Sequence, residues 1–254
     1  TTASTGNIWL GVAVGMACGL ALALLHGFVV LYRSGTQLAT GLAVTFLGTG
    51  LTALFGDEYV SRGIHGFKPV ALPGLSRIPL LGSVLFDHDP LTYLGLLAAP
   101  ALWWLLFHTS AGLAIRAAGE DEAVLVAQGK SARRTRLLAT AGGGALAGLG
   151  GAQLSTAYTL TWSQGMTVGR GFVAVTLVIF AAWHPIKAIG GAWFFAGAVA
   201  LQLQLQARGT EISPFLLNAV PYLATIAVLT VWGRHRMAAA PDGLQRVFEA
   251  TPTR

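Results

Sequence analysis

Residues that commonly carry out catalytic or metal chemistry are few in this sequence and stand far apart. The histidines show no His-Glu-x-x-His motif and no pair four residues apart; they are His26, His65, His88, His108, His184 and His235. His65 and His88, with Asp87 and Asp89, could be considered as metal ligands, but we expect a solvated loop there instead. Neither Ser155 nor Ser163 lies in a Gly-x-Ser-x-Gly elbow, and no phosphate-binding Gly-x-x-x-x-Gly-Lys-Ser/Thr loop occurs. We therefore predict no enzyme activity, no metal and no cofactor.

The elements that would have to position any functional residue are long apolar segments. Of the 254 residues, 54% are hydrophobic and only 10% are charged, whereas a soluble domain carries about 25% charged residues. Six segments of about 18 residues or more contain no charged residue and are long enough to cross a hydrocarbon layer of ~30 Å: 8–31, 37–55, 90–107, 137–156, 188–205 and 215–232. The fold class we predict is an all-α, polytopic transmembrane helical bundle. Because residues 1–7 contain neither a starting Met nor a basic signal-like region, we expect further spans to precede them.

Positive charge predicts which ends of the spans face the cytoplasm. If successive segments alternate sides, one side carries eleven Lys and Arg residues: Arg33, Arg116, Lys130, Arg133, Arg134, Arg136, Lys187, Arg234, Arg236, Arg246 and Arg254. The other side carries five: Arg62, Lys68, Arg77, Arg170 and Arg208. The first set is then cytoplasmic, the C-terminus is inside, and the net charge of +6 reflects these loops rather than nucleic-acid binding.

This alternation requires a seventh crossing between Ser163 and Lys187, where the apolar stretch 172–183 has only 12 residues. As a helix it would span about 18 Å, which is short of the bilayer thickness. A glycine-rich approach precedes it and His184-Pro185 closes it. We predict a half-helix with irregular backbone, as found along the substrate paths of transporters. Glycines inside the other segments, such as Gly41, Gly48, Gly144 and Gly148, predict close packing between helices.

The loop at 116–136 contains signals for one short cytoplasmic helix. Glu120, Asp121 and Glu122 suit its first turn, Gly129 suits the position just after its end, and cations follow. The helix would have about nine residues, too few to be stable alone, and its centre is apolar. We therefore expect it to dock on a partner, which could be the lipid interface or a groove in another protein.

The stretch from Gly119-Glu120 to Gly129, followed by Arg133-Arg134-Thr135-Arg136-Leu137 and the glycine-rich segment 144–152, resembles the coupling-helix region of branched-chain amino acid and sugar-type ABC permeases. In that family the short helix fits a cleft on a cytoplasmic ATPase. The resemblance implies a type II ABC importer permease-like fold and ATPase-coupling roles for Gly119, Glu120, Asp121, Ala123, Ala127, Gly129 and Arg133. The sequence departs from the family at Gly129-Lys130, where Gly-Ile is usual, and in its valine-rich centre.

Two further stretches, 41–51 and 162–185, with the alternating Gln202, Gln204 and Gln206 beyond, are similar to the simple-sugar and nucleoside branch of that family. The resemblance implies import of nucleosides or related small polar, sugar-like molecules. A nucleoside offers a flat ring for stacking and several hydrogen-bonding groups. Candidate substrate-pathway residues are therefore the polar and aromatic groups beside irregular backbone: Thr45, Thr49, Trp162, Gln164, Thr167, Arg170 and Asn218. Trp162 could instead be an interfacial aromatic residue, and Arg170 could extend to the outer surface.

The resemblance also implies partners and a location. These are cytoplasmic ABC ATPase subunits, a second permease subunit, an extracytoplasmic substrate-binding protein and the bacterial plasma (inner) membrane. Residues 1–232 would form one transmembrane domain and 233–254 a cytoplasmic tail. The long loop 56–89 is either a contact for the binding protein or a simple exposed loop. A secondary transporter or channel without an ATPase partner is the alternative, although the apolar segments lack the ionisable residues that usually couple ions.

Overall fold

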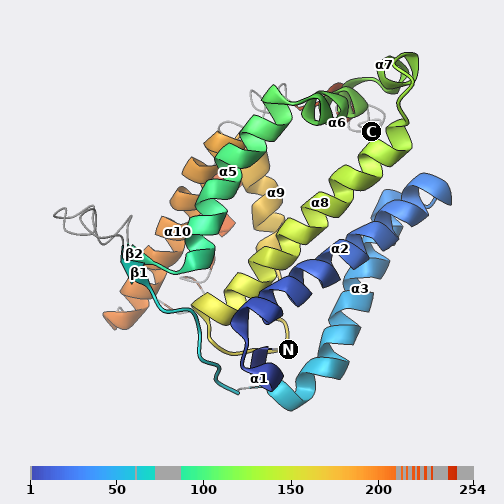
Figure 1. The fold of residues 1–254 in the computed structure, drawn as a ribbon. Helices are drawn as coiled ribbons and strands as arrows, with labels where there is room; N and C mark the ends of the chain where they lie inside the picture. Colours follow the sequence, from blue (N-terminus) through green and yellow to red (C-terminus); the bar gives the residue numbers. More distant parts are fainter. Residues whose placement is uncertain are drawn as a thin grey trace. The chain divides into compact units, whose positions relative to one another are not determined.

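The computed structural model describes residues 2–60, 62–71 and 87–209, together with residues 213, 216, 219, 220, 222, 223, 226, 227, 230 and 240–244. These fold as two compact units, whose helices are shown in Figure 1. The first unit comprises residues 1–95 and 129–167, and the second comprises residues 96–128 and 168–254. Helix α5 (Pro90–His108) begins in the first unit and continues into the second.

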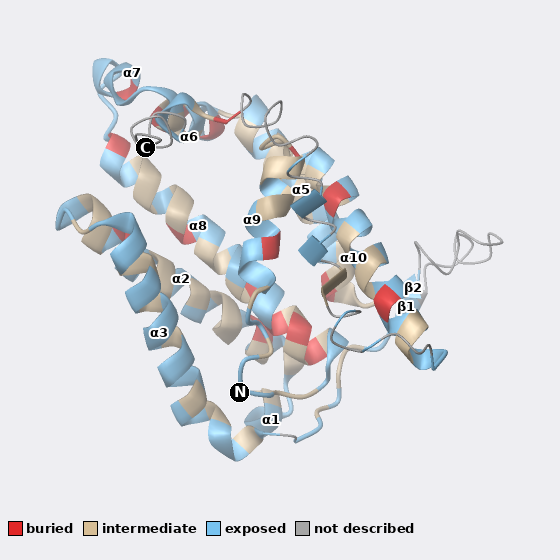
Figure 2. Ribbon diagram, turned by 180° about the vertical axis from the view of Figure 1, so that it is seen from behind, coloured by how far each residue is buried: buried red, intermediate tan, exposed pale blue. Residues whose placement is uncertain are grey.

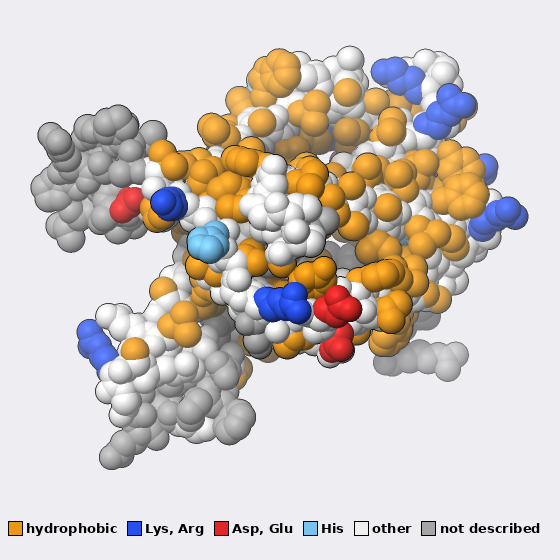
Figure 3. Space-filling view, turned by 60° about the horizontal axis from the view of Figure 1, so that its bottom comes forward, with side chains coloured by type: hydrophobic (Ala, Val, Ile, Leu, Met, Phe, Trp, Pro, Cys, Tyr) orange, Lys and Arg blue, Asp and Glu red, His pale blue; other side chains and the backbone are white. Residues whose placement is uncertain are grey.

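Four helices of the described chain are long and apolar enough to span a membrane, which confirms four of the six predicted segments. They are α2 (Ile8–Tyr32), α3 (Gln37–Gly56) extended by the short 3₁₀ turn η1 (Asp57–Tyr59), α5 (Pro90–His108) and α10 (Pro185–Ala207). Buried residues are sparse along them (Figure 2), and none of the residues of α3 is buried. Hydrophobic side chains spread over much of the visible face (Figure 3). Apolar surface of this extent is stable against lipid or another membrane subunit rather than against water.

The fifth predicted segment lies in α8 (Ala132–Gln153) and η3 (Leu154–Tyr158), and the sixth, 215–232, lies largely outside the described residues. The main contact of the first unit joins α8 to α2 through two matching Gly-x-x-x-Gly pairs, Gly15/Gly19 and Gly144/Gly148. A Cβ on Gly19 would lie 2.9 Å from the Gly148 Cα, and one on Gly144 would lie 2.6 Å from the Gly19 carbonyl oxygen. The two backbones therefore touch, which confirms the close packing predicted for Gly144 and Gly148. A Cβ on Gly41 or Gly48 would meet only ordinary side-chain contacts, at 3.9 and 3.6 Å, so no such close approach is found there.

Beside the α2–α8 contact lies a small core of Val12, Leu91, Leu149 and Ala152, against which Met16 and Phe67 pack. The segment that carries Phe67 is held along residues 156–162. The Ile64 amide donates to the Leu160 carbonyl at 2.9 Å, and the Phe67 amide donates to the Thr156 carbonyl at 3.2 Å. Strands β1 (Val70–Ala71) and β2 (Asp87–His88) pair antiparallel with Val70 opposite His88. Within the predicted loop 56–89, residues 64–67 are thus held against η3 and the residues that follow it.

The end of α8 departs from regular α-helix in a way the sequence did not predict. The π-helical stretch η3 widens the last turn, and Leu160 then adopts a left-handed backbone with φ of 55°. Thr156, only 3% exposed, satisfies its hydroxyl by donating to the Ala152 carbonyl at 2.7 Å. π-Helical turns often mark functional positions, because they shift the side chains that follow.

In the second unit, α5 turns sharply into α6 (Ser110–Glu120), as Figure 1 shows. Thr109 caps α6 by accepting from the Gly112 amide at 3.0 Å. A Cβ on Gly112 would lie 2.5 Å from the Leu106 Cα, so glycine permits the tight corner. Helix α6 was not predicted; the sequence suggested a loop between residue 108 and the short helix. That helix is present as α7 (Glu122–Ala127).

The predicted half-helix is confirmed as α9 (Arg170–Phe180), which has 11 residues and follows Gly169 with φ of 81°. Its end differs from the prediction. Ala181 caps it, and Ala182 and Trp183 adopt left-handed backbone with φ of 50° and 56°, so the helix stops three residues earlier than expected. His184 is extended, and Pro185 occupies the first turn of α10, where its missing N–H costs nothing.

Candidate functional site

The corner between α6 and α7 is made by a single extended residue, Asp121, with φ of −148° and ψ of 121°. Its carboxylate Oδ1 accepts from the Ala123 amide at 2.9 Å, which caps α7. At the other end, Gln128 closes the helix and Gly129 adopts the left-handed conformation with φ of 69°. The stop signal predicted at Gly129 is therefore confirmed.

Helix α7 has one buried and one exposed apolar side. Leu125 is fully buried, at 0% exposure, and α7 packs against α6. Val124 and Val126 are 46% and 63% exposed, and the side chains of Ala123 and Ala127 are exposed beside them. A six-residue helix is too short to be stable by itself, so Leu125 must hold it in place. The exposed valines and alanines then form a small apolar surface on a short helix that is capped at its start.

The predicted coupling residues divide between three elements. Gly119 and Glu120 belong to the last turn of α6, so the three consecutive acids do not share the first turn of one helix as predicted. Asp121, Ala123 and Ala127 lie in or cap α7, which is six residues long rather than about nine. Arg133 is exposed in the first turn of α8, which belongs to the first unit.

A contact of this corner with residues 240–244 was missed by sequence reasoning. The Asp242 amide donates to Glu120 Oε2 at 2.9 Å, and a Cβ on Gly243 would lie 2.5 Å from the Gly119 carbonyl oxygen. Ala240 and Ala118 are buried, at 5% and 3% exposure. The Pro241-Asp242-Gly243 run is a recognisable turn signal, but nothing in the sequence indicates where that turn docks.

A second group of candidate residues lies on α3. Thr45 and Thr49 share one face with Thr52 and Gly56, because they are spaced by three or four residues. Their hydroxyls donate to carbonyls of the same helix, Thr45 to Gly41 at 2.9 Å and Thr49 to Thr45 at 2.8 Å. Each oxygen retains acceptor capacity, and both residues are exposed. This face can therefore accept hydrogen bonds from a polar molecule that carries N–H or O–H groups.

Trp162 lies at the end of this face. Its indole packs on Gly56, where a Cβ would lie 2.5 Å from the ring, and its backbone forms a bridge with Val60. Gln164 and Thr167 are exposed on the turns that follow, where Gly165 has φ of 76°. The structure therefore brings Thr45, Thr49 and Trp162 to one side of α3 within the first unit.

The other two predicted pathway residues lie outside the described part of the first unit. Arg170 is the exposed first residue of α9 and belongs to the second unit. Asn218 lies outside the described residues.

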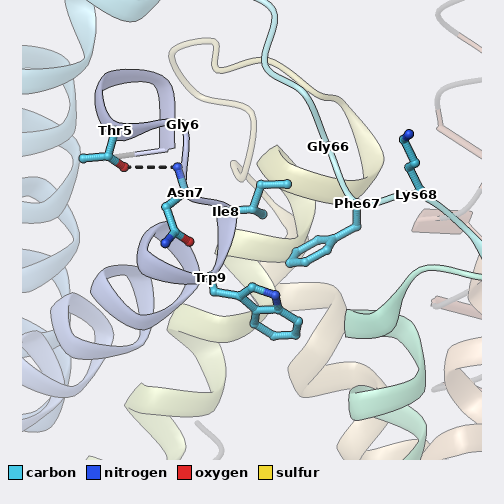
Figure 4. Close-up of a pocket in the computed structure, with 8 residues that line it drawn as sticks. All are labelled: Thr5, Gly6, Asn7, Ile8, Trp9, Gly66, Phe67 and Lys68. Carbon is cyan, nitrogen blue, oxygen red and sulfur yellow. Dashed lines mark hydrogen bonds between the residues drawn. The ribbon is translucent and has the colours of Figure 1, made fainter.

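A shallow pocket of about 510 Å³ lies elsewhere in the first unit, between the start of α2 and the segment 66–68 (Figure 4). The rings of Trp9 and Phe67 meet edge to face at 4.9 Å along its wall. Asn7 accepts from the Leu10 amide at 3.2 Å and its own amide donates to Thr5 Oγ1 at 3.3 Å, so its polar groups serve the helix start. The pocket contains none of the predicted pathway residues.

Asp89, which follows His88, has a structural role. Asp89 caps α5 by accepting from the Leu91 and Thr92 amides at 2.9 and 3.0 Å, and from the Thr92 hydroxyl at 2.6 Å. Gln153 in turn donates to Thr92 Oγ1 at 3.0 Å, which ties the start of α5 to the end of α8. Among the residues that the structure describes, no three His, Cys, Asp or Glu side chains gather as metal ligands.

Comparison with known proteins finds similarity to permease subunits of transporters. Residues 1–229 match the family described as "Branched-chain amino acid transport system / permease component". The chain is 40% identical over 251 residues to a putative glucose ABC transporter permease protein of Haloferax volcanii, covering 90% of this chain and 76% of that protein. It is 30% identical over 230 residues to the guanosine ABC transporter permease protein NupQ of Bacillus subtilis, covering 87% and 72%.

A third relative is the nucleoside ABC transporter permease protein NupC of Lactococcus lactis. The two are 26% identical over 246 residues, and the match covers 94% of this chain and 78% of that protein. No solved structure matches the chain.

Proposed function

Because the chain belongs to the branched-chain amino acid transport permease family of ABC transporters, we propose that it is an importer subunit for a nucleoside or simple sugar, driven by a separate ATPase. As a member of this family it is a multi-pass membrane transport subunit and not itself an enzyme. The relatives named for glucose, guanosine and nucleosides transport molecules that share a polyhydroxylated sugar ring.

The observation that carries the ATPase part of the proposal is the exposed side of α7. Helix α7 is capped by Asp121, and its Leu125 is fully buried. Val126, next to Leu125, is 63% exposed, although the residues that precede the helix are acidic. In water, apolar side chains held in this way are costly unless a partner covers them. A cleft of an ATPase subunit that accepts a short helix would bury these side chains. A movement of the cleft would then be passed from α7 to α6 and on to α5.

The substrate part of the proposal is supported by the α3 face. Thr45 and Thr49 offer acceptor oxygens to sugar hydroxyls, and the indole of Trp162 offers a surface on which a base or a sugar ring can stack. Gln164 and Thr167 are exposed next to Trp162 in the chain and would complete the lining. Arg170 and Asn218 remain candidates for the same path.

The proposed partners follow from the transport class. They are cytoplasmic ATPase subunits, a second permease subunit that covers the exposed α3, and an extracytoplasmic binding protein that delivers the substrate. The larger set of Lys and Arg residues supports a cytoplasmic location for the α6–α7 corner and the C-terminus. The proposed location of the chain is a bacterial plasma membrane, as the family resemblance implies.

Val126→Asp tests the coupling role, with Val70→Asp as a matched control. Both valines are exposed, at 63% and 48%. Val70 lies in β1, which is predicted to be on the side of the membrane that faces away from the cytoplasm. We expect the detergent-solubilised permease with Val126→Asp to lose at least about tenfold in affinity for its cognate ATPase, because burying an unpaired carboxylate is costly. The control should bind the ATPase normally. Equal binding by both variants would overturn the coupling role of α7.

The substrate is tested by calorimetry on the cognate binding protein. We expect saturable binding of guanosine or adenosine, or of glucose or ribose, and not of branched-chain amino acids. Binding of leucine or valine with no binding of sugar-containing compounds would overturn the substrate class while leaving the coupling role intact.

A further inference from the structure

The last turn of α6 carries an anionic side chain where a helix disfavours one. Glu120 is the final residue of α6, and the partial negative charge of a helix C-terminus repels a carboxylate there. The carboxylate is offset by a hydrogen bond from 122 residues further along the chain, the Asp242 amide donating to Oε2 at 2.9 Å. Hydrogen bonds to an ionised acceptor are stronger than neutral ones.

The turn formed by residues 240–244 also touches the backbone of α6. A Cβ on Gly243 would lie 2.5 Å from the Gly119 carbonyl oxygen, so no larger residue fits there without displacement. A Cβ on Gly119 would lie 3.4 Å from the Pro241 Cβ. The turn closes on itself through the Leu244 amide, which donates to the Pro241 carbonyl at 2.8 Å. Residues 240–244 are thus a preformed turn seated on both the backbone and the last side chain of α6.

The contact between residues 240–244 and α6 lies next to Asp121, the residue that joins α6 to α7. Only Asp121 separates Glu120 from the first residue of α7, and that one extended residue sets the angle between the two helices. If α7 has the proposed coupling role, a force applied to it reaches α5 through this corner. The movement passed on to α5 would then depend on how firmly the end of α6 is held.

We propose that the turn at 240–244 is a brace for the α6–α7 corner, with Glu120 and Gly243 as positioning residues that set how much transport each ATP supports. This inference rests on the proposed coupling role of α7. It predicts that releasing the brace lowers the ratio of substrate imported to ATP hydrolysed while the ATPase still binds.

The contact itself is tested by a disulfide. Cys18 is the only cysteine in the sequence, so Cys18→Ser gives a cysteine-free background. In the full-length permease, Gly119→Cys with Pro241→Cys places two Cβ atoms close to the ~3.5–4.5 Å separation of a disulfide. We expect mild oxidation to link the two peptides, as detected by mass spectrometry. The control pair Gly190→Cys with Pro241→Cys should stay unlinked, because nothing lies within 4 Å of a Cβ on Gly190. Failure of the first pair to link, or equal linking of both pairs, overturns the brace.

The role is tested with two variants of one residue. Asp242→Pro removes the amide hydrogen that Glu120 accepts, whereas Asp242→Ala retains it, and proline is tolerated at the first position of a helical turn. In proteoliposomes with the cognate ATPase and binding protein, we expect Asp242→Pro to import less substrate per ATP, because one lost hydrogen bond weakens the docking equilibrium of the turn by about threefold to tenfold. Asp242→Ala should behave as the unmodified protein.

A rescue separates positioning from general damage. Adding the oxidised Gly119→Cys/Pro241→Cys link to Asp242→Pro should restore the ratio, and reduction should abolish the gain. Unchanged coupling in Asp242→Pro, or no rescue by the link, overturns the brace. If Val126→Asp lowers ATPase binding while Asp242→Pro has no effect, only the brace fails. If Val126→Asp also has no effect, the proposed function of α7 itself fails.

Discussion

The indole of Trp162 packs against Gly56 at the end of α3, and a Cβ on Gly56 would lie within 2.5 Å of the ring. This contact joins the threonine face of α3 to the irregular segment that follows the π-helical stretch η3. Two regions that are separate in the sequence and were both predicted to line a substrate path therefore adjoin in the first unit.

Trp162→Ala should raise the KM for substrate uptake about tenfold, because stacking on an aromatic ring contributes roughly 0.5–1.5 kcal/mol beyond its burial. Trp162→Phe keeps a flat ring and should raise the KM less than threefold. Uptake by proteoliposomes containing the complete transporter measures both. A fall in maximal rate at unchanged KM for Trp162→Ala would indicate that the ring only supports the fold.

Gly148→Leu should destabilise the first unit by about 1–3 kcal/mol, since an added side chain would push the backbones of α2 and α8 apart. A Cβ there already lies 3.0 Å from the Met16 Cα. Gly143→Leu is the matched control in the same helix, because nothing lies within 4 Å of its Cβ. Unfolding of the purified protein in detergent, followed by circular dichroism, compares the two. Equal destabilisation would contradict the Gly-x-x-x-Gly contact.

Much of this fold could be predicted from the sequence because lipid imposes simple requirements on length and polarity. The four membrane-length helices, the half-helix after Gly169 and the stop at Gly129 each follow from a local signal. Close packing at Gly144 and Gly148 also follows from composition, although only the structure shows that Gly15 and Gly19 of α2 meet them.

Other features depend on competition between signals or on contacts far apart in the chain. Glu120, Asp121 and Glu122 suggested one first turn, but the Asp121 side chain caps α7 and its extended backbone separates α7 from α6. The contact between Glu120 and Asp242 joins residues 122 positions apart and has no periodic pattern. The π-helical stretch likewise has no composition of its own that distinguishes it from α-helix.

Asp89→Ala should lower stability by about 1–2 kcal/mol, because it removes the cap of α5 and the partner of the Thr92 hydroxyl that Gln153 also contacts. Asp87→Ala, at an exposed neighbouring acid, should change stability by less than about 0.5 kcal/mol. Thermal unfolding of the detergent-solubilised variants measures the difference. A larger loss for Asp87→Ala would be inconsistent with the capping contacts.

Single cysteines in the Cys18→Ser background should report the predicted sidedness. Gln128→Cys, at the end of α7, and Lys68→Cys, in the segment after η1, both place a thiol at an exposed position. In intact cells a membrane-impermeant maleimide should label Lys68→Cys and should reach Gln128→Cys only after permeabilisation. The reverse labelling pattern would invert the orientation inferred from the charges.

Energy coupling is tested most directly by substrate uptake into proteoliposomes that contain the permease, its cognate ATPase and its binding protein. We expect uptake of the sugar-containing substrate that requires ATP, and that is lost when the ATPase carries a substitution blocking hydrolysis. Uptake by the permease without the ATPase, driven by an ion gradient alone, would contradict an ATPase-driven importer.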